Sequence, residues 1–266
     1  MTTTLRGMMA FNLKVSIVET AVHSGVSGGA IPETFRIANS LLDRLEDTET
    51  RRLPEFEVEI PESFRKEAED IANLVGEELV NQYKFLDGCR AINHDNLPEV
   101  YLNTNWRPSL AITGASNMPD TSVAGNVVRN STTLRVSIRL PPGLDSQEAL
   151  AKATKMLTED PPFGAKVELL DAMGGDGWQM KDLSEKTLTV LEDASKNFYG
   201  KGCGYYGIGG SIPFLKVLGD KFPSTEILAL GVLGPESSAH APNETLNLPY
   251  TKKFIGALSH TLAGLA

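Results

Sequence analysis

The sequence predicts an α/β fold in two successive parts, and three patterns along the chain support that prediction. Apolar and polar residues alternate in several short segments, which indicates strands covered on one face. Apolar residues recur at helical spacing between and after these segments. A glycine-rich stretch, Asp171–Gly177, is expected to link the two parts. We therefore place the first domain at residues 1–170 and the second at residues 171–266.

The first part begins with a strand and a helix. Apolar and polar side chains alternate within Met8–Val22, as in a strand with one buried face. The chain then breaks at His23–Gly29, and Pro32 suits the first turn of a helix expected at Ile31–Glu46. An insertion is expected at residues 47–107, with a helix at Pro61–Tyr83 and a loop at Gly88–Asn105.

Two strands, a helix and a last strand complete the first part. They are expected at Ser109–Thr113, Thr132–Leu140, Asp145–Glu159 and Lys166–Leu170, with Asp145 or Ser146 as the N-cap of the helix. The resulting order is strand, helix, insertion, strand, strand, helix, strand. This is the split βαβ order of a ferredoxin-like α+β sandwich.

The second part alternates between helix and strand. Helices are expected at Leu183–Phe198, from about Ile212, and at Pro249–Leu265, with a buried strand at Ile227–Leu233. This alternation favours an α/β layer, but the part is too short for a complete doubly wound sheet. We therefore expect open strand edges and exposed apolar surface.

Composition excludes several classes of partner. With 25 Lys and Arg against 34 Asp and Glu, the net charge is −9, which argues against nucleic acid or an anionic membrane as a partner. Cys89 and Cys203 are too few for a disulfide framework, so a reducing compartment is expected. No apolar run is long enough to span a bilayer, and the first residues do not resemble a signal peptide. These features favour the cytoplasm.

Four positions stand out as candidate site residues from their local pattern alone. The glycines of Gly207–Pro213 allow a close backbone approach, and Ser211 adds a hydroxyl before an expected helix, which suits a carboxylate or another anion. His240 follows an expected strand, where it suits metal ligation, proton transfer or simple solvation. Arg139 ends a strand before two prolines, as a carboxylate clamp or a surface charge. His23, between a strand and a helix, is either functional or an ordinary loop side chain.

Six separated motifs run the length of the chain. They are Leu-Arg-Gly at Leu5–Gly7, His-Ser-Gly-x-x-Gly-Gly at His23–Gly29, Gly-Asn-Val at Gly125–Val127, Ser-Ile-Arg-Leu-Pro-Pro at Ser137–Pro142, Gly-Gly-Ser-Ile-Pro-Phe at Gly209–Phe214, and Gly-Pro…Ala-His-Ala-Pro-Asn-Glu at Gly234–Glu244. In this order the set resembles the zinc-dependent metallopeptidases that include carnosinase-type dipeptidases, aminoacylase and succinyl-diaminopimelate desuccinylase. The Gly-Gly-Ser-Ile-Pro element and the helical insertion favour the dipeptidase branch.

The resemblance implies a metal ligand and a substrate-binding element. His240 matches the last ligand of a two-zinc site, although manganese or cobalt can share such ligand sets. Gly210 and Ser211 match the element that holds the free carboxylate of a dipeptide or N-acyl amino acid. Arg139 matches an arginine of the lid domain that also grips the substrate.

The resemblance also implies a homodimer built through the lid, which corresponds to residues 1–170. His23 and Asn126 match lid residues that reach into the active site of the partner subunit. There the histidine helps to stabilise the oxyanion of the tetrahedral intermediate. Residues 171–266 correspond to the C-terminal portion of an α/β catalytic domain.

The remaining metal ligands and the catalytic Glu of the family have no match here. In the family they precede the lid, whereas Met1 stands almost at the start of the lid in this sequence. No His-x-Asp pair occurs, Glu77-Glu78 lies within an expected helix, and Ile208 replaces a Glu that relatives often carry. We therefore expect the lid and C-terminal part of a dipeptidase-like hydrolase, inactive alone. The alternative is a non-catalytic dimerisation or regulatory protein derived from such an enzyme.

Overall fold

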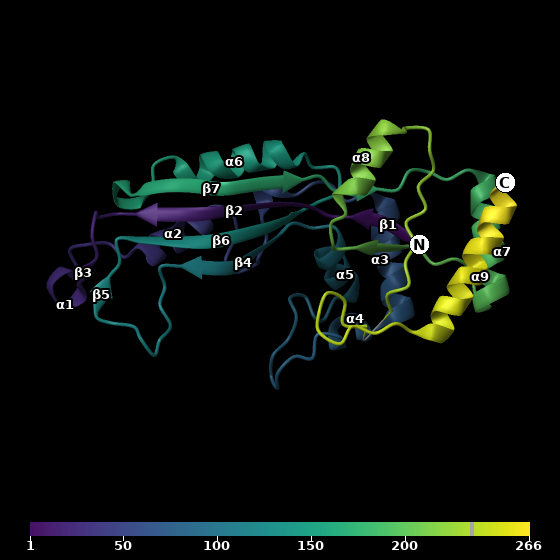
Figure 1. Ribbon diagram of the computed structural model, residues 1–266, viewed down its shortest axis with the longest axis horizontal. Helices are drawn as coiled ribbons and strands as arrows, with labels where there is room; N and C mark the ends of the chain where they lie inside the picture. The colour runs from purple at the N-terminus through teal and green to yellow at the C-terminus, as the bar shows by residue number, and fades with distance from the viewer. Residues whose placement is uncertain (235–236) are drawn as a thin grey trace. The chain divides into compact units, whose positions relative to one another are not determined.

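The computed structural model describes residues 1–234 and 237–266 (Figure 1). The chain divides into two compact units. The large unit comprises Thr4–Trp178 and Ile208–Val217, and the small unit comprises Met1–Thr3, Gln179–Gly207 and Leu218–Ala266. The domain boundary expected near residue 170 stays a prediction.

Helices and strands are mixed throughout the described residues, so the predicted α/β class is confirmed. The strands are β1 (Thr2–Leu5), β2 (Gly7–Ser16), β3 (Val22–His23), β4 (Ser109–Ser116), β5 (Val127–Val128), β6 (Ser131–Leu140), β7 (Lys166–Gly175), β8 (Trp178–Gln179) and β9 (Tyr206–Ile208). The α-helices are α1 (Ser24–Ser27), α2 (Thr34–Leu42), α3 (Glu62–Val75), α4 (Glu78–Asn81), α5 (Leu97–Asn105), α6 (Ser146–Thr158), α7 (Glu185–Tyr199), α8 (Pro213–Lys221) and α9 (Leu248–Leu265). Short 3-10 helices lie at Pro54–Phe56 and Pro162–Gly164.

A four-stranded antiparallel sheet in the order β4-β6-β2-β7 forms the centre of the large unit. Strands β2 and β6 pair over their whole length, from Gly7 opposite Leu140 to Ser16 opposite Ser131. With α2 after β2 and α6 after β6, this is the predicted split βαβ arrangement. Two smaller sheets have the orders β8-β1-β9 and β3-β5.

The sheet is buried on one face, and this decides which side chains remain available on the other. Along β6, residues Leu134, Val136, Ile138 and Leu140 are at most 1% exposed and join the core formed with α2 and α6. Each such side chain contributes about 1.5–3 kcal/mol on burial. Because side chains alternate along a strand, Arg139 lies on the opposite face from this core.

The insertion has a small core of its own, and one prediction about it is wrong. The segment expected as a loop at Gly88–Asn105 contains helix α5, which buries Tyr101 and Leu102 against α3. Two start signals explain this helix. Asn96 Oδ1 accepts a hydrogen bond from the Glu99 N–H at 3.3 Å, and a proline occupies the first turn.

Two other predicted segments differ from the observed secondary structure. The expected linker at Asp171–Gly177 belongs largely to β7, because β2 is long enough to pair with it as far as Gly175. A register shift between Ala10 and Asn12 of β2 absorbs one extra residue of β7. The strand expected at Ile227–Leu233 reduces to one bridge, in which the Thr2 N–H donates to the carbonyl of Ala229 at 3.0 Å.

The small unit is built on the packing of α7 against α9. Gly256 of α9 has no room for a Cβ, which would lie 2.3 Å from Cε1 of Phe198. At the start of α7, Glu226 accepts hydrogen bonds from Thr187 and from the Ser184 N–H, and these lower the pKa of its carboxyl group. No helix among the described residues is both long and apolar enough to cross a membrane.

Candidate functional site

A buried arginine ties together three segments of the large unit. Arg6 lies between β1 and β2 and is only 8% exposed. Its Nε donates to the Gly209 carbonyl at 3.1 Å, and its Nη1 donates to Asn103 O at 3.2 Å, Arg107 O at 2.9 Å and Ser109 Oγ at 3.2 Å. These acceptors are all neutral, and no described carboxylate forms an ion pair with Arg6. The charge of this guanidinium is therefore buried without a counter-charge from the described part of the chain.

A second arginine meets Arg6 through Ser211. Nη1 of Arg139 donates to Ser211 Oγ at 2.9 Å, and that hydroxyl donates to the Arg6 carbonyl at 2.6 Å. Burial, followed by the charge of Arg139, lowers the pKa of the Arg6 guanidinium to about 10. Two neighbouring guanidinium groups without a described carboxylate between them create a positive potential that favours an anion. We call Arg6, Arg139 and Ser211 the arginine–serine cluster.

The glycines beside this cluster have different roles. A Cβ on Gly209 would lie 2.1 Å from the carbonyl oxygen of Thr104, so this position must be glycine for the loop to pack against α5. A Cβ on Gly210 would lie 3.7 Å from Ile208, which is an ordinary contact. The N–H groups of Gly210 and Ser211 have no acceptor among the described residues, and they immediately precede α8. Such free donors suit a carboxylate.

His23 and Asn126 come together in the small β3-β5 sheet. His23 pairs with Val127, and the Ser24 N–H donates to the carbonyl of Asn126 at 2.9 Å. The side chains of His23 and Asn126 are exposed. Nδ1 of His23 accepts the Gly25 N–H at 3.1 Å, so a neutral ring carries its proton on Nε2. Nε2 is therefore the atom that can donate to a ligand.

These two groups of residues lie at opposite ends of the central sheet. The β3-β5 sheet lies beyond the end of β6 that begins at Ser131, whereas Arg139 lies near its other end (Figure 1). At about 3.3 Å per residue, the strand between Ser131 and Arg139 spans about 26 Å. One copy of the large unit therefore does not bring His23 to the arginine–serine cluster.

His240 lies in the small unit, in a loop with an unusual backbone. It is exposed, and its φ of 59° is left-handed, as are those of Ser238 at 52° and Asn243 at 63°. Pro235 and Glu236 of the same predicted motif lie outside the described residues.

The donor set does not by itself fit a metal centre. Within residues 1–234 and 237–266, no three His, Cys, Asp or Glu side chains form a group that could hold a metal ion. A catalytic zinc requires about three protein ligands and an open position. His240 alone does not meet that requirement.

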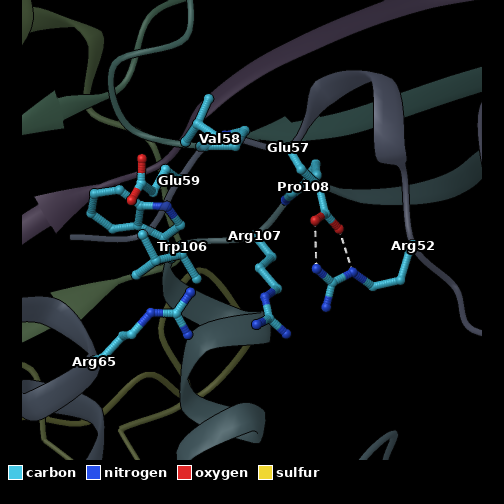
Figure 2. A pocket seen from close by; sticks show the side chains of 10 residues that line it. Arg52, Glu57, Val58, Glu59, Arg65, Trp106, Arg107 and Pro108 are labelled. Carbon is cyan, nitrogen blue, oxygen red and sulfur yellow. Dashed lines mark hydrogen bonds and ion pairs between the residues drawn. The ribbon is translucent and has the colours of Figure 1, made fainter. Parts of the chain in front are cut away.

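A small cavity of about 70 Å³, which the sequence did not predict, is lined by residues of the insertion together with Pro108 and Pro141. In the view of Figure 2, the Arg107 side chain lies between those of Arg65 and Arg52, and Arg52 pairs with Glu57. Trp106 Nε1 and Arg107 Nε are buried without an acceptor among the residues that the structure describes. The charges of the three lining arginines are balanced by the lining Glu57 and Glu59 and by Glu99, which pairs with Arg107. The cavity therefore does not select an anion.

Sequence patterns also missed the part played by Arg6. The Leu5–Gly7 motif contributed to the family resemblance but suggested no contact for its arginine. The only local signal is one cation between two segments that become strands. Its partners lie about 100 and 200 positions away in the chain, so their identity appears only in the fold.

Comparison with known proteins agrees with this architecture. The M20 peptidase dimerisation domain matches residues 3–164. A cysteinylglycine-S-conjugate dipeptidase of Corynebacterium striatum is 26% identical over 258 residues, covering 93% of this chain and 52% of the relative. The Cys-Gly metallodipeptidase DUG1 of Saccharomyces cerevisiae is 24% identical over 271 residues, covering 98% of this chain and 54% of the relative. The chain thus spans about half the length of these curated relatives.

Solved structures share the fold across nearly the whole chain. The dipeptidase Dug1p of Saccharomyces cerevisiae aligns with a TM-score of 0.74 at 22% identity, over 99% of this chain and 55% of that one. Human carnosine dipeptidase 1 aligns with a TM-score of 0.73 at 18% identity, over 99% of this chain and 56% of that one. The family resemblance inferred from the six motifs is therefore confirmed, and the chain belongs to the M20 peptidase dimerisation-domain family.

Proposed function

We propose that this chain supplies the lid, the carboxylate-binding element and one metal ligand of a dipeptidase-type metallopeptidase. The reaction is hydrolysis of the peptide or amide bond next to the free carboxylate of a dipeptide or N-acyl amino acid. The arginine–serine cluster is the observation that carries this proposal, because it offers two cations and no described counter-charge. The dipeptidase names of the curated relatives support the same substrate class.

In this proposal the substrate carboxylate binds beside the arginine–serine cluster. Arg139 provides charge-assisted hydrogen bonds, and the free N–H groups of Gly210 and Ser211 provide further donors at the start of α8. A hydrogen bond to a charged group contributes about 1.5–3 kcal/mol. Fixing the carboxylate in this way orients the neighbouring bond for attack.

His23 is proposed to act on the substrate held by another copy of the chain. The span of about 26 Å along β6 separates it from Arg139 within one copy. In the second copy, Nε2–H of His23 would donate to the developing oxyanion, with Asn126 beside it. A complete site therefore requires a homodimer.

The edge strand β4 supports a dimer through the lid. Ile112 pairs with Val136, so both side chains lie on the same face of the sheet. Val136 is fully buried, whereas Ile112 is 44% exposed because α2 and α6 do not cover this edge. An uncovered apolar residue on an open strand edge suits pairing with a second copy.

His240 is proposed as one ligand of a metal centre. The other ligands of that centre are proposed to come from outside the described residues of this chain. Zinc, manganese or cobalt suits such a ligand set. When bound, such a metal supplies Lewis-acid polarisation and a water of lowered pKa. The left-handed backbone at His240 supports a constrained functional loop, since sparsely populated conformations gather at such sites.

The direct test is hydrolysis of the dipeptide Cys-Gly, together with metal content, measured on this chain alone and after mixing with the N-terminal half of the yeast relative. We expect little metal and no turnover alone, and metal-dependent turnover in the mixture. Arg139→Met should then lower kcat/KM by at least about tenfold, since it removes a charge-assisted contact. Arg135→Met, on the same strand face, is the matched control and should retain activity.

A different outcome would favour the second candidate, a non-catalytic dimerisation or regulatory protein. The match to a dimerisation domain and the exposed Ile112 favour this alternative. It prevails if the chain dimerises but the mixture remains inert. Turnover by the chain alone would instead contradict the proposal that most of the metal centre lies elsewhere. Residence in the cytoplasm and the identity of the metal stay predictions.

A further inference from the structure

We infer that Ser211 is a positioning residue whose hydroxyl orients Arg139 and does not itself donate to the substrate carboxylate. This inference rests on the proposed function and divides the work within the arginine–serine cluster. Arg139 and the backbone N–H groups bind the carboxylate, and the serine hydroxyl holds the Arg139 side chain in position.

The argument begins with the single proton of the hydroxyl. A serine hydroxyl has one O–H donor and two lone pairs. The donor of Ser211 is directed to the Arg6 carbonyl at 2.6 Å, and one lone pair accepts Nη1 of Arg139 at 2.9 Å. The hydroxyl proton is therefore already engaged, and toward Arg139 the oxygen is an acceptor.

The carbonyl that holds this proton is itself fixed. Arg6 lies between two strands, and its guanidinium donates four hydrogen bonds to Gly209, Asn103, Arg107 and Ser109. With 8% of the residue exposed, the peptide has little freedom to turn. Directing the Ser211 proton to a ligand would leave the Arg6 carbonyl without this partner, which opposes the change. Arg6 is therefore a second positioning residue.

The same geometry leaves suitable donors on Arg139. A guanidinium has five N–H donors, and only the Nη1 bond to Ser211 is made among the described residues. Nε and Nη2 remain available as one edge for a bidentate carboxylate. The N–H groups of Gly210 and Ser211 complete the donor set without using the hydroxyl.

A double-mutant cycle with N-acetylglycine as the probe tests this division. Dissociation constants are measured by calorimetry for the wild type, Ser211→Ala, Arg139→Met and the double variant. We expect Arg139→Met to weaken binding by at least about tenfold and Ser211→Ala by roughly three- to tenfold. The double variant should bind no more weakly than Arg139→Met, because without the arginine the hydroxyl has nothing to position. Effects that multiply would identify the hydroxyl as a direct ligand and overturn the inference.

A ligand-free measurement keeps this inference separate from the proposed function. ¹⁵N relaxation of the Arg139 Nε–H signal should show greater mobility in Ser211→Ala than in the wild type. Ser137→Ala, on the same face of β6, is the matched control and should leave the signal unchanged. An unchanged Arg139 signal in Ser211→Ala contradicts the inference. If mobility rises but the wild type does not bind N-acetylglycine, the carboxylate site fails while the positioning role stands.

Discussion

The two ends of strand β6 differ in how the chain presents its polar groups. At the Arg139 end, two guanidinium groups and a hydroxyl form a connected set of hydrogen bonds, with Arg6 almost fully buried. At the Ser131 end, His23 and Asn126 lie exposed on a two-stranded sheet of only two residue pairs. The first end is preorganised within one copy of the chain, and the second presents its side chains outward.

This difference indicates how structure and function are divided between the ends. Buried polar groups are costly unless each has a partner, so the Arg139 end contributes to the stability of the fold and also prepares a binding site. The exposed end carries little of the fold and is free to meet another copy. Substitutions should therefore affect stability strongly at the centre and at the Arg139 end, and weakly at the His23 end.

The largest expected effect on the free energy of unfolding comes from the hydrophobic core that both ends of β6 share. Phe11 lies in the middle of β2 and is fully buried among the residues of α2, α6 and β6. Phe11→Ala should reduce the free energy of unfolding by about 3–5 kcal/mol, because it removes buried apolar surface and leaves a cavity. Urea unfolding followed by circular dichroism measures the loss. Val26→Ala, at a side chain that is 82% exposed, should change stability by less than about 0.5 kcal/mol.

A substitution at Gly209 should disrupt the Arg139 end of β6 and leave the His23 end intact. The Cβ of Gly209→Ala would lie 2.1 Å from the carbonyl of Thr104, so the loop must move away from α5. We expect a loss of about 1–3 kcal/mol in unfolding free energy, as for an overpacked site, and weaker binding of N-acetylglycine. Gly210→Ala is the matched control, since its Cβ meets only Ile208 at 3.7 Å. Equal effects at the two glycines would contradict the proposed packing.

The dimer proposed through the open edge of β4 predicts an effect of intermediate size. Ile112→Lys places a charge on the uncovered edge strand β4 and should weaken self-association by about tenfold or more. Analytical ultracentrifugation over a range of protein concentrations measures the change. Leu170→Lys tests the opposite edge strand β7, where the side chain is 41% exposed. Dissociation caused by the second variant alone would move the interface to β7.

Local periodicity was enough to predict the sheet and the face on which Arg139 lies. Alternation along Thr132–Leu140 reflects burial on one side, and the observed strand β6 follows it residue by residue. Helix α6 and its N-cap were also predictable, since Asp145 accepts from the Gln147 and Glu148 N–H groups as a capping residue should. These features depend on neighbours in sequence.

The contacts that define the candidate site depend on distant residues instead. Nothing near Arg6 in the sequence indicates that its guanidinium will meet Gly209 or Arg107. Helix α5 was missed because its apolar residues belong to a small core shared with α3, whose position is set by the fold. The roles of Gly210, Ser211 and His240 rest on the family resemblance and stay proposals, as do those of His23 and Asn126.

The smallest effect on stability is expected at His23, and this position gives the sharpest separation of fold from function. Its side chain is exposed and, within the described part of the chain, makes one hydrogen bond, from the Gly25 N–H. His23→Ala should therefore change the free energy of unfolding by less than about 0.5 kcal/mol. In the mixture with the N-terminal half of the relative, the same variant should lower kcat by about a hundredfold, as expected when an oxyanion donor is removed. Stability and kcat that fall together would instead make His23 a structural residue, and the two ends of the sheet would then no longer differ in kind.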